Sequence, residues 1–139
     1  MTLSRDEFEK FVARAVERLP LHIQKKIKNV AFVVESVPHE RILKKMGVRR
    51  ERALLGLYEG IPQTAWGKDL NFRFPDKITL FKSAIERYAE TREELEELIA
   101  HTVWHEIGHY FGFGEKEIRA LERKWKMRNG KKESAFSVK

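Results

Sequence analysis

Hydrophobic spacing along the first third of the chain predicts two helical segments followed by a strand. Ser4 and Glu7 form a capping box, so a helix should begin there. Pro20 interrupts its helical spacing, and a shorter helical piece continues through Ile27. The apolar positions of the first helix are Phe8, Phe11, Val12, Ala15 and Leu19. Residues 30–34 are apolar without alternation, which predicts a strand covered on both faces at the centre of a sheet.

The middle of the chain predicts a short helix, two more strands and a long loop. Ser36 and Pro38 suit the cap and first turn of a helix through Met46, which Gly47 would end. Residues 54–58 and 77–81 have the composition of strands. Gly, Pro and Asn between residues 60 and 75 are typical of a loop.

A long helix is predicted from Thr91 onward, because Thr91 and Glu94 form a second capping box. Its apolar stripe consists of Leu95, Leu98, Ile99 and Thr102. At about 100° per residue, His105, Glu106 and His109 continue this stripe into the core. Polar residues on a core-facing stripe indicate a specific chemical role.

The role that fits is metal binding, since His105-Glu106-Ile107-Gly108-His109 has the H-E-x-x-H pattern. Two histidines one helical turn apart can reach one Zn²⁺ ion. Glu106 could hold the zinc-activated water, take its proton as general base and pass that proton to the leaving amine. With the 5 His of this chain, chance would produce such a pattern about 0.02 times.

A third ligand is expected, because catalytic zinc usually has three protein ligands. Gly112 is placed to end the helix with positive φ, which would let Glu115 point back at the metal. Two alternatives remain for this position: Glu115 is a solvent-facing carboxylate at the start of another helix, or Glu117 takes its place. His101 lies about 12 Å along the helix from His109, so we expect it behind the ligands or at the surface.

Other residues with suitable chemistry are left out of the predicted site. His22 and His39 have no positional argument, and Met127 is expected at a helix end. Tyr58 and Tyr110 could donate hydrogen bonds to a developing oxyanion, but packing is their more common use.

The amino-acid composition limits which other classes of protein are possible. The 139 residues fit one domain, expected at 1–127, with a flexible basic tail at 128–139. No Cys is present, which excludes thiolate chemistry and disulfides. The net charge of +7 permits nucleic-acid binding, but stacking aromatics do not accompany the basic runs, so no specific nucleic acid is expected. No leader or membrane-spanning pattern is found, which favours the cytoplasm.

Three stretches resemble the small bacterial zincin-like metallopeptidases, often described as minimal zincins. They are residues 54–64, residues 78–81, and residues 102–112 followed by an acidic residue. The resemblance implies an α/β (α+β) fold in which a small mixed sheet packs with helices, one of them carrying the metal motif. It also implies zinc on His105 and His109, catalysis by Glu106 and a carboxylate ligand at Glu115, where the family commonly has Asp.

Two functions follow as hypotheses. The first is a zinc metallopeptidase that hydrolyses peptide bonds of a peptide or protein substrate, which would pair in extended form with an exposed strand beside the motif helix. The second is a zinc-stabilised binding or regulatory module with little hydrolytic activity. Nothing in the chain predicts an oligomeric state.

Overall fold

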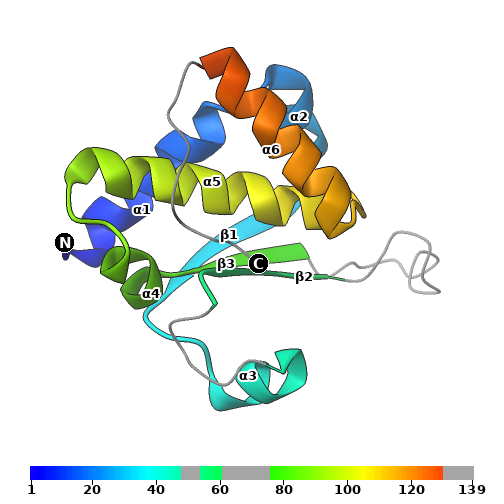
Figure 1. Cartoon of the computed structure of the whole chain (residues 1–139). Helices are drawn as coiled ribbons and strands as arrows, with labels where there is room; N and C mark the ends of the chain where they lie inside the picture. The colour runs from blue at the N-terminus through cyan, green and yellow to red at the C-terminus, as the bar shows by residue number, and fades with distance from the viewer. Residues whose placement is uncertain (48–53, 61–75, 130–139) are drawn as a thin grey trace.

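The computed structural model describes residues 1–47, 54–60 and 76–129, except for the side chains of Met46, Glu115 and residues 125–129. Within these ranges the chain forms a three-stranded sheet and six helices (Figure 1). In chain order the elements are α1 (Arg5–Glu17), α2 (Leu21–Lys26), β1 (Val30–Glu35), α3 (Glu40–Met46), β2 (Gly56–Glu59), β3 (Asp76–Phe81), α4 (Lys82–Arg87), α5 (Arg92–Tyr110) and α6 (Glu115–Asn129).

The sheet is mixed, with strand order β1-β3-β2. Strand β1 runs parallel to β3, and β2 runs antiparallel to it. The predicted mixed sheet packed with helices is therefore confirmed. The prediction that residues 30–34 lie at its centre is wrong: among the described strands β3 is central, and most of β1 is only half-buried. Continuous apolar sequence here reflects partial cover by helices on an edge strand, with α1 in contact with β1.

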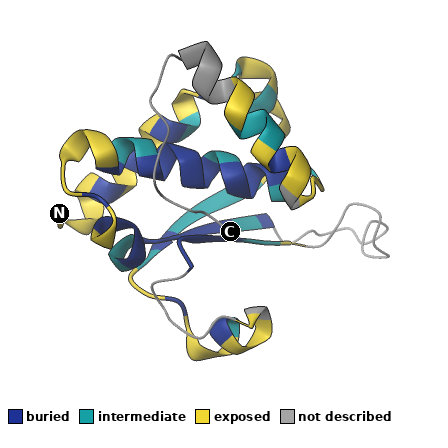
Figure 2. Ribbon diagram, in the orientation of Figure 1, coloured by how far each residue is buried: buried dark blue, intermediate teal, exposed yellow. Residues whose placement is uncertain are grey.

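Helix α5 lies across one face of the sheet and contacts both β2 and β3 (Figure 1). Helices α1 and α6 pack against α5 in turn, whereas α3 lies beyond the sheet on the other side. The buried residues concentrate along α5 and β3, as Figure 2 shows. Helix α5 is thus the central element of the core, and any polar group on its inner face is removed from water.

Residues at the helix ends, such as N-caps and glycines, explain most helix boundaries. The Ser4 hydroxyl accepts from the Glu7 N–H at 3.2 Å at the start of α1, as the capping box predicts. Helix α3 begins later than expected, at Glu40, and its N-cap is His39 rather than Ser36. The His39 Nδ1 accepts from the Arg41 N–H, which an imidazole nitrogen can do as well as a hydroxyl. Gly47 ends the helix with φ of 70° as predicted.

Some expectations fall at the edges of the described ranges. The loop predicted at 60–75 lies outside them apart from Gly60. Helix α6 continues to Asn129, so the first two residues of the expected tail are helical, and 130–139 lie outside the description. In the described part of the chain, no helix is long and apolar enough to cross a membrane.

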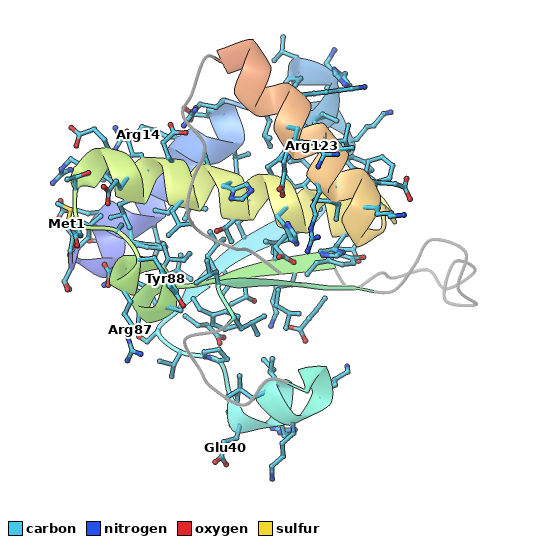
Figure 3. All side chains as sticks on the ribbon, in the orientation of Figure 1. Met1, Arg14, Glu40, Arg87, Tyr88 and Arg123 are labelled. Atoms are coloured by element: carbon cyan, nitrogen blue, oxygen red, sulfur yellow. The ribbon has the colours of Figure 1, made fainter. Side chains whose placement is uncertain are left out.

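Charged side chains lie mainly on the outer surfaces of the helices. Arg14 on α1 and Arg123 on α6, for example, project away from the core (Figure 3). Arg14 and Arg18 each pair with a glutamate of α5 across the α1–α5 contact. Part of the basic charge is therefore balanced locally.

Candidate metal centre

Helix α5, which carries the H-E-x-x-H pattern, has a defined start and end. The Thr91 hydroxyl accepts from the Glu94 N–H at 3.1 Å, so the second capping signal is confirmed at the backbone. At the other end Gly112 has φ of 83°, and the N–H of Phe113 bonds the Gly108 carbonyl at 3.0 Å. This left-handed glycine stops the helix just beyond His109 and turns the chain toward α6, as predicted.

Three side chains of the pattern converge on one face of α5. His105, Glu106 and His109 offer nitrogen and oxygen atoms that all lie within 4.8 Å of one another, so they could hold a metal ion. The two imidazole rings have centroids 5.0 Å apart. His105 and Glu106 are buried, with 1% and 2% of their surface exposed, and His109 is half-buried. The predicted juxtaposition of these three residues is present in the structure.

Strand β2 approaches the motif helix closely because residue 56 is glycine. A Cβ atom on Gly56 would lie 2.7 Å from Cγ2 of Thr102 and 3.2 Å from Cγ of Glu106. Two residues further along β2, the main-chain N–H of Tyr58 donates to Oε1 of Glu106 at 3.0 Å. The carboxylate of Glu106 is thus oriented by the main chain of β2, which is at an edge of the sheet that the described residues form.

Helix α6 packs on the other side of the motif helix, again through a glycine. A Cβ on Gly108 would lie 2.7 Å from Cγ1 of Ile118. This packing brings Glu122 of α6 to the histidines, with its Oε1 2.9 Å from Nδ1 of His105 and its Oε2 3.0 Å from Nε2 of His101. His101 is buried, so of its two predicted positions the surface position is wrong.

The charge state of Glu122 follows from these contacts. Burial alone would raise the pKa of this carboxyl. The hydrogen bonds from His101 and His105, and the positive charge that each ring carries when it is protonated, outweigh burial and lower the pKa of Glu122 to about 2. Glu122 is therefore an ionised acceptor near neutral pH.

Tyr58 and Tyr110 form an edge-on ring contact beside the site, with centroids 5.7 Å apart. The Tyr58 hydroxyl donates to Asp76 at 3.4 Å. Burial, the charge of Asp76, that hydrogen bond and Tyr110 together raise the pKa of Tyr58 to about 12. Burial and Asp76 also raise the pKa of Tyr110. Both rings pack here, in agreement with the more common of their two predicted uses.

The structure shows where the other residues that the sequence raised for the site lie. Glu115 is the first residue of α6, but its side chain is outside the description, so its predicted contact with the metal stays a prediction. Glu117 is exposed, and its carboxylate accepts from the Gly114 N–H at 3.4 Å. Met127 lies within α6 rather than in a separate turn. His39 caps α3, away from the site.

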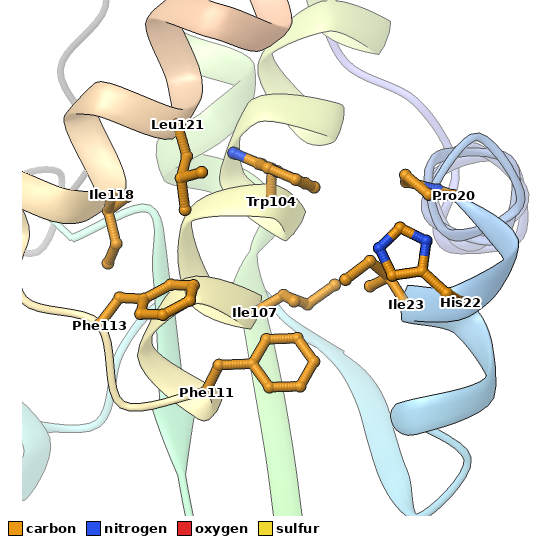
Figure 4. A pocket seen from close by; sticks show the side chains of 10 residues that line it. Pro20, His22, Ile23, Trp104, Ile107, Phe111, Phe113, Ile118 and Leu121 are labelled. Atoms are coloured by element: carbon orange, nitrogen blue, oxygen red, sulfur yellow. The ribbon is translucent and has the colours of Figure 1, made fainter.

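A cavity of about 300 Å³ lies on the face of α5 that points away from the candidate ligands. Side chains of α2, α5 and α6 and of the segments next to these helices line it (Figure 4). Its lining is mainly apolar, with Trp104 and Ile107 from α5, Phe111 directly after α5, Ile118 and Leu121 from α6, and Ile23 and the histidine His22 from α2. None of His105, Glu106 and His109 lines it. His22 is thus separate from the candidate centre, as expected.

The chemistry of the gathered donors fits zinc. Imidazole nitrogen and carboxylate oxygen are common zinc ligands, and a neighbouring carboxylate that accepts from one ligand histidine is a usual feature of such sites. The cluster contains no thiolate, as required by the absence of Cys. A site of this donor type is the kind that catalytic zinc uses.

The fold and the site together define a zincin-like protein, in which a helix with the H-E-x-x-H pattern lies against a small mixed sheet. The model of the zincin-like metallopeptidase family matches residues 27–125. The chain therefore belongs to this family, and the resemblance found in the sequence is confirmed. A comparison with curated proteins finds no match.

Two contributors to the site were missed in the sequence. Glu122 was not singled out, although Ile118, Leu121 and Glu122 follow helical spacing and place one carboxylate on the apolar face of α6. That signal could have identified it. The Tyr58 N–H could not have been found, because every residue except proline has such a donor and only the approach of β2 to α5 selects this one.

Proposed function

We propose that this member of the zincin-like metallopeptidase family is a zinc-dependent peptidase, in which His105 and His109 hold one Zn²⁺ ion and Glu106 is the general base. The observation that carries the proposal is the convergence of these three side chains within 4.8 Å. When bound, zinc would supply a Lewis acid that polarises the scissile carbonyl and lowers the pKa of water. We also propose Glu115 as third ligand, since it follows the left-handed turn at Gly112 by three residues.

Glu106 would move the proton of the reaction. It accepts a proton from water as the water oxygen bonds to the scissile carbonyl carbon, and it returns that proton to the nitrogen as the C–N bond breaks. The hydrogen bond from the Tyr58 N–H holds one carboxylate oxygen in place. A fixed carboxylate is suited to this work because catalytic groups must be held close to their productive geometry.

The substrate would bind in extended form along β2. This strand is at an edge of the described sheet, and its main chain already contacts Glu106. A peptide that pairs with β2 would gain main-chain hydrogen bonds and pass beside α5. Its scissile carbonyl would then lie close to His105, Glu106 and His109. We take residues 1–127 as the single domain that performs this function.

The proposal is tested by zinc analysis and peptide cleavage. Purified wild-type protein and Glu106→Gln are each measured for bound zinc and incubated with a diverse mixture of unstructured peptides, and products are identified by mass spectrometry. We expect both proteins to bind zinc, and cleavage by Glu106→Gln to fall at least about 100-fold, since general-base catalysis contributes that much. Equal cleavage by the two zinc-loaded proteins would contradict the assignment of Glu106.

A zinc-stabilised binding module is the second candidate, and one observation favours it. Glu122 connects His105 to α6, so an ion at His105 would also brace the contact between α5 and α6. This candidate predicts that chelation unfolds the protein and that Glu106→Gln has no effect on its function in cells. Cleavage that depends on Glu106 would exclude it as the sole function.

A further inference from the structure

Glu122 binds two buried histidines with its two carboxylate oxygens. Oε1 lies 2.9 Å from Nδ1 of His105, and Oε2 lies 3.0 Å from Nε2 of His101. Only 12% of the Glu122 side chain is exposed, and the two imidazoles are more deeply buried still. The three groups form a polar cluster between α5 and α6.

Hydrogen-bond chemistry fixes the protonation pattern at His105. The 2.9 Å between Nδ1 of His105 and Oε1 of Glu122 is a hydrogen-bond distance, and the carboxylate oxygen is the acceptor, so Nδ1 carries the hydrogen that it donates to Glu122. The form of His105 that can bind a metal ion is the neutral imidazole, which has one donor nitrogen and one acceptor nitrogen. Nε2 of His105 therefore carries the lone pair that a metal ion requires, and His105 does not have to change tautomer to bind one.

Packing of α6 does not by itself require a carboxylate at position 122. Ile118 is 1% exposed and already fills the space above Gly108. A buried carboxylate costs free energy unless it is fully hydrogen-bonded, and an apolar residue of similar size would avoid that cost. The presence of Glu at this position is explained if its contact with His105 serves the site.

We propose that Glu122 is a positioning residue of the metal centre, which holds His105 in the tautomer and ring orientation that binds the ion. Nε2 of His101 lies 3.0 Å from the second oxygen of Glu122, where a protonated ring would pair with the carboxylate. The inference rests on the proposed function only in that His105 is taken as a metal ligand. The effect of Glu122 is on metal affinity and on the His105 tautomer.

The test compares zinc affinity in wild-type protein, Glu122→Ala, Glu122→Gln and a control, Glu93→Gln. Glu93 is an exposed residue of the same helix as the histidines, so its variant makes a Glu-to-Gln change at a distance from the cluster. Affinity is measured by competition with a zinc-binding dye, and folding of each metal-free variant is checked by circular dichroism. We expect Glu122→Ala to bind zinc about 10- to 100-fold more weakly than wild type, the usual effect of removing a partner of a ligand histidine. Glu93→Gln should match wild type.

Glu122→Gln keeps the inference testable if the alanine variant does not fold. Its amide has nearly the same size and retains an oxygen that can accept from Nδ1 of His105. We therefore expect an affinity between those of wild type and Glu122→Ala. If Glu122 only packed α6, the zinc affinity of Glu122→Ala and Glu122→Gln would change only as far as their folding stability changes. The partial rescue by the glutamine amide would then not be seen.

A second readout does not depend on zinc. Nitrogen NMR of the metal-free protein reports which imidazole nitrogen of His105 carries the hydrogen, and we expect the Nδ1–H form in wild type and a mixture of tautomers in Glu122→Ala. An unchanged tautomer, or equal zinc affinity in folded Glu122→Ala and wild type, would overturn the positioning role. Failure of the wild-type chain to bind zinc would instead overturn the proposed function, so the two failures are distinct.

Discussion

Two buried glutamates, Glu86 and Glu106, show that the neighbours of a carboxylate decide whether it stabilises the fold or can take part in a reaction. Glu86 is 7% exposed, accepts from the Leu3 N–H at 2.8 Å and pairs with Lys82 at 3.1 Å. Its contacts attach the start of the chain to α4. Glu106 is buried to a similar extent but has a main-chain donor and two histidines as neighbours. Only the second carboxylate has groups beside it that a reaction could use.

At the residue scale, the Tyr58 hydroxyl should lose its proton only at high pH. Burial and Asp76 raise its pKa from 10.0 to about 12. Because the pKa in the folded state exceeds that in the unfolded chain, the stabilisation by the neutral phenol is complete below pH 10.0 and is lost as the pH rises toward about 12. We expect Tyr58→Phe to remove the phenolate absorbance that develops near that upper value in an ultraviolet titration.

Asp76→Asn provides the control for this titration. It removes the negative charge next to the Tyr58 hydroxyl, so the Tyr58 pKa should move back toward 10.0 while burial still holds it above that value. If the absorbance lost in Tyr58→Phe develops at 10.0 in the wild-type protein, the raised pKa is wrong.

At the scale of elements, the fit between β2 and α5 depends on Gly56. Its missing side chain leaves room for Thr102 and Glu106. The Cβ of Gly56→Ala would lie 2.7 Å from the Thr102 methyl, so the strand or the helix must shift. We expect a loss of about 1–3 kcal/mol in the free energy of unfolding, which is typical of overpacking, measured by denaturant titration.

A second substitution tests the cause. Thr102→Ser removes the clashing Cγ2 but keeps the hydroxyl that donates to the Leu98 carbonyl at 2.7 Å. In the double variant Gly56→Ala with Thr102→Ser, part of the lost stability should return. Gly114→Ala is the matched control, because its Cβ would meet only Glu117 Oε1 at 3.8 Å and should cause little loss. Equal losses in Gly56→Ala and Gly114→Ala would contradict the close-approach argument.

Sequence patterns predicted elements better than their arrangement. The capping boxes at Ser4 and Thr91 and the glycine stops at Gly47 and Gly112 act within a few residues, so they could be identified in the sequence. The position of β1 in the sheet could not, since an apolar run does not indicate which strand lies beside it, and here it did not correspond to full burial either. The same limit applies to the site: spacing located His105, Glu106 and His109 on one helix and could have placed Glu122 on the apolar face of another, but it could not show that the two helices bring these side chains together.

At the scale of the whole molecule, zinc should stabilise the fold. An ion that binds the folded chain alone adds stability by mass action, about 2.7 kcal/mol when its free concentration is 100 times the dissociation constant. For a domain of this size, such a gain corresponds to a rise of roughly 5–15 °C in the thermal midpoint. We expect zinc to raise the midpoint of the wild-type protein, and a chelator to reverse the rise, in differential scanning fluorimetry.

Histidine variants identify where this stabilisation originates. His109→Gln should remove most of the zinc-dependent rise, because it deletes one proposed ligand. His22→Gln should keep it, since His22 lines the cavity on the other face of α5. An equal rise in wild-type protein and His109→Gln would show that zinc binds elsewhere on the chain.

The length of the short connection between α5 and α6 determines which residue of α6 reaches the polar cluster. Glu122 follows His105 by 17 positions, and only Phe111 to Gly114 separate the two helices. Each residue added to a helix turns its face by about 100°, so a single insertion before Ile118 would exchange the carboxylate for a neighbouring side chain. The number of residues in this segment is therefore as important to the candidate metal centre as the chemical identity of its side chains.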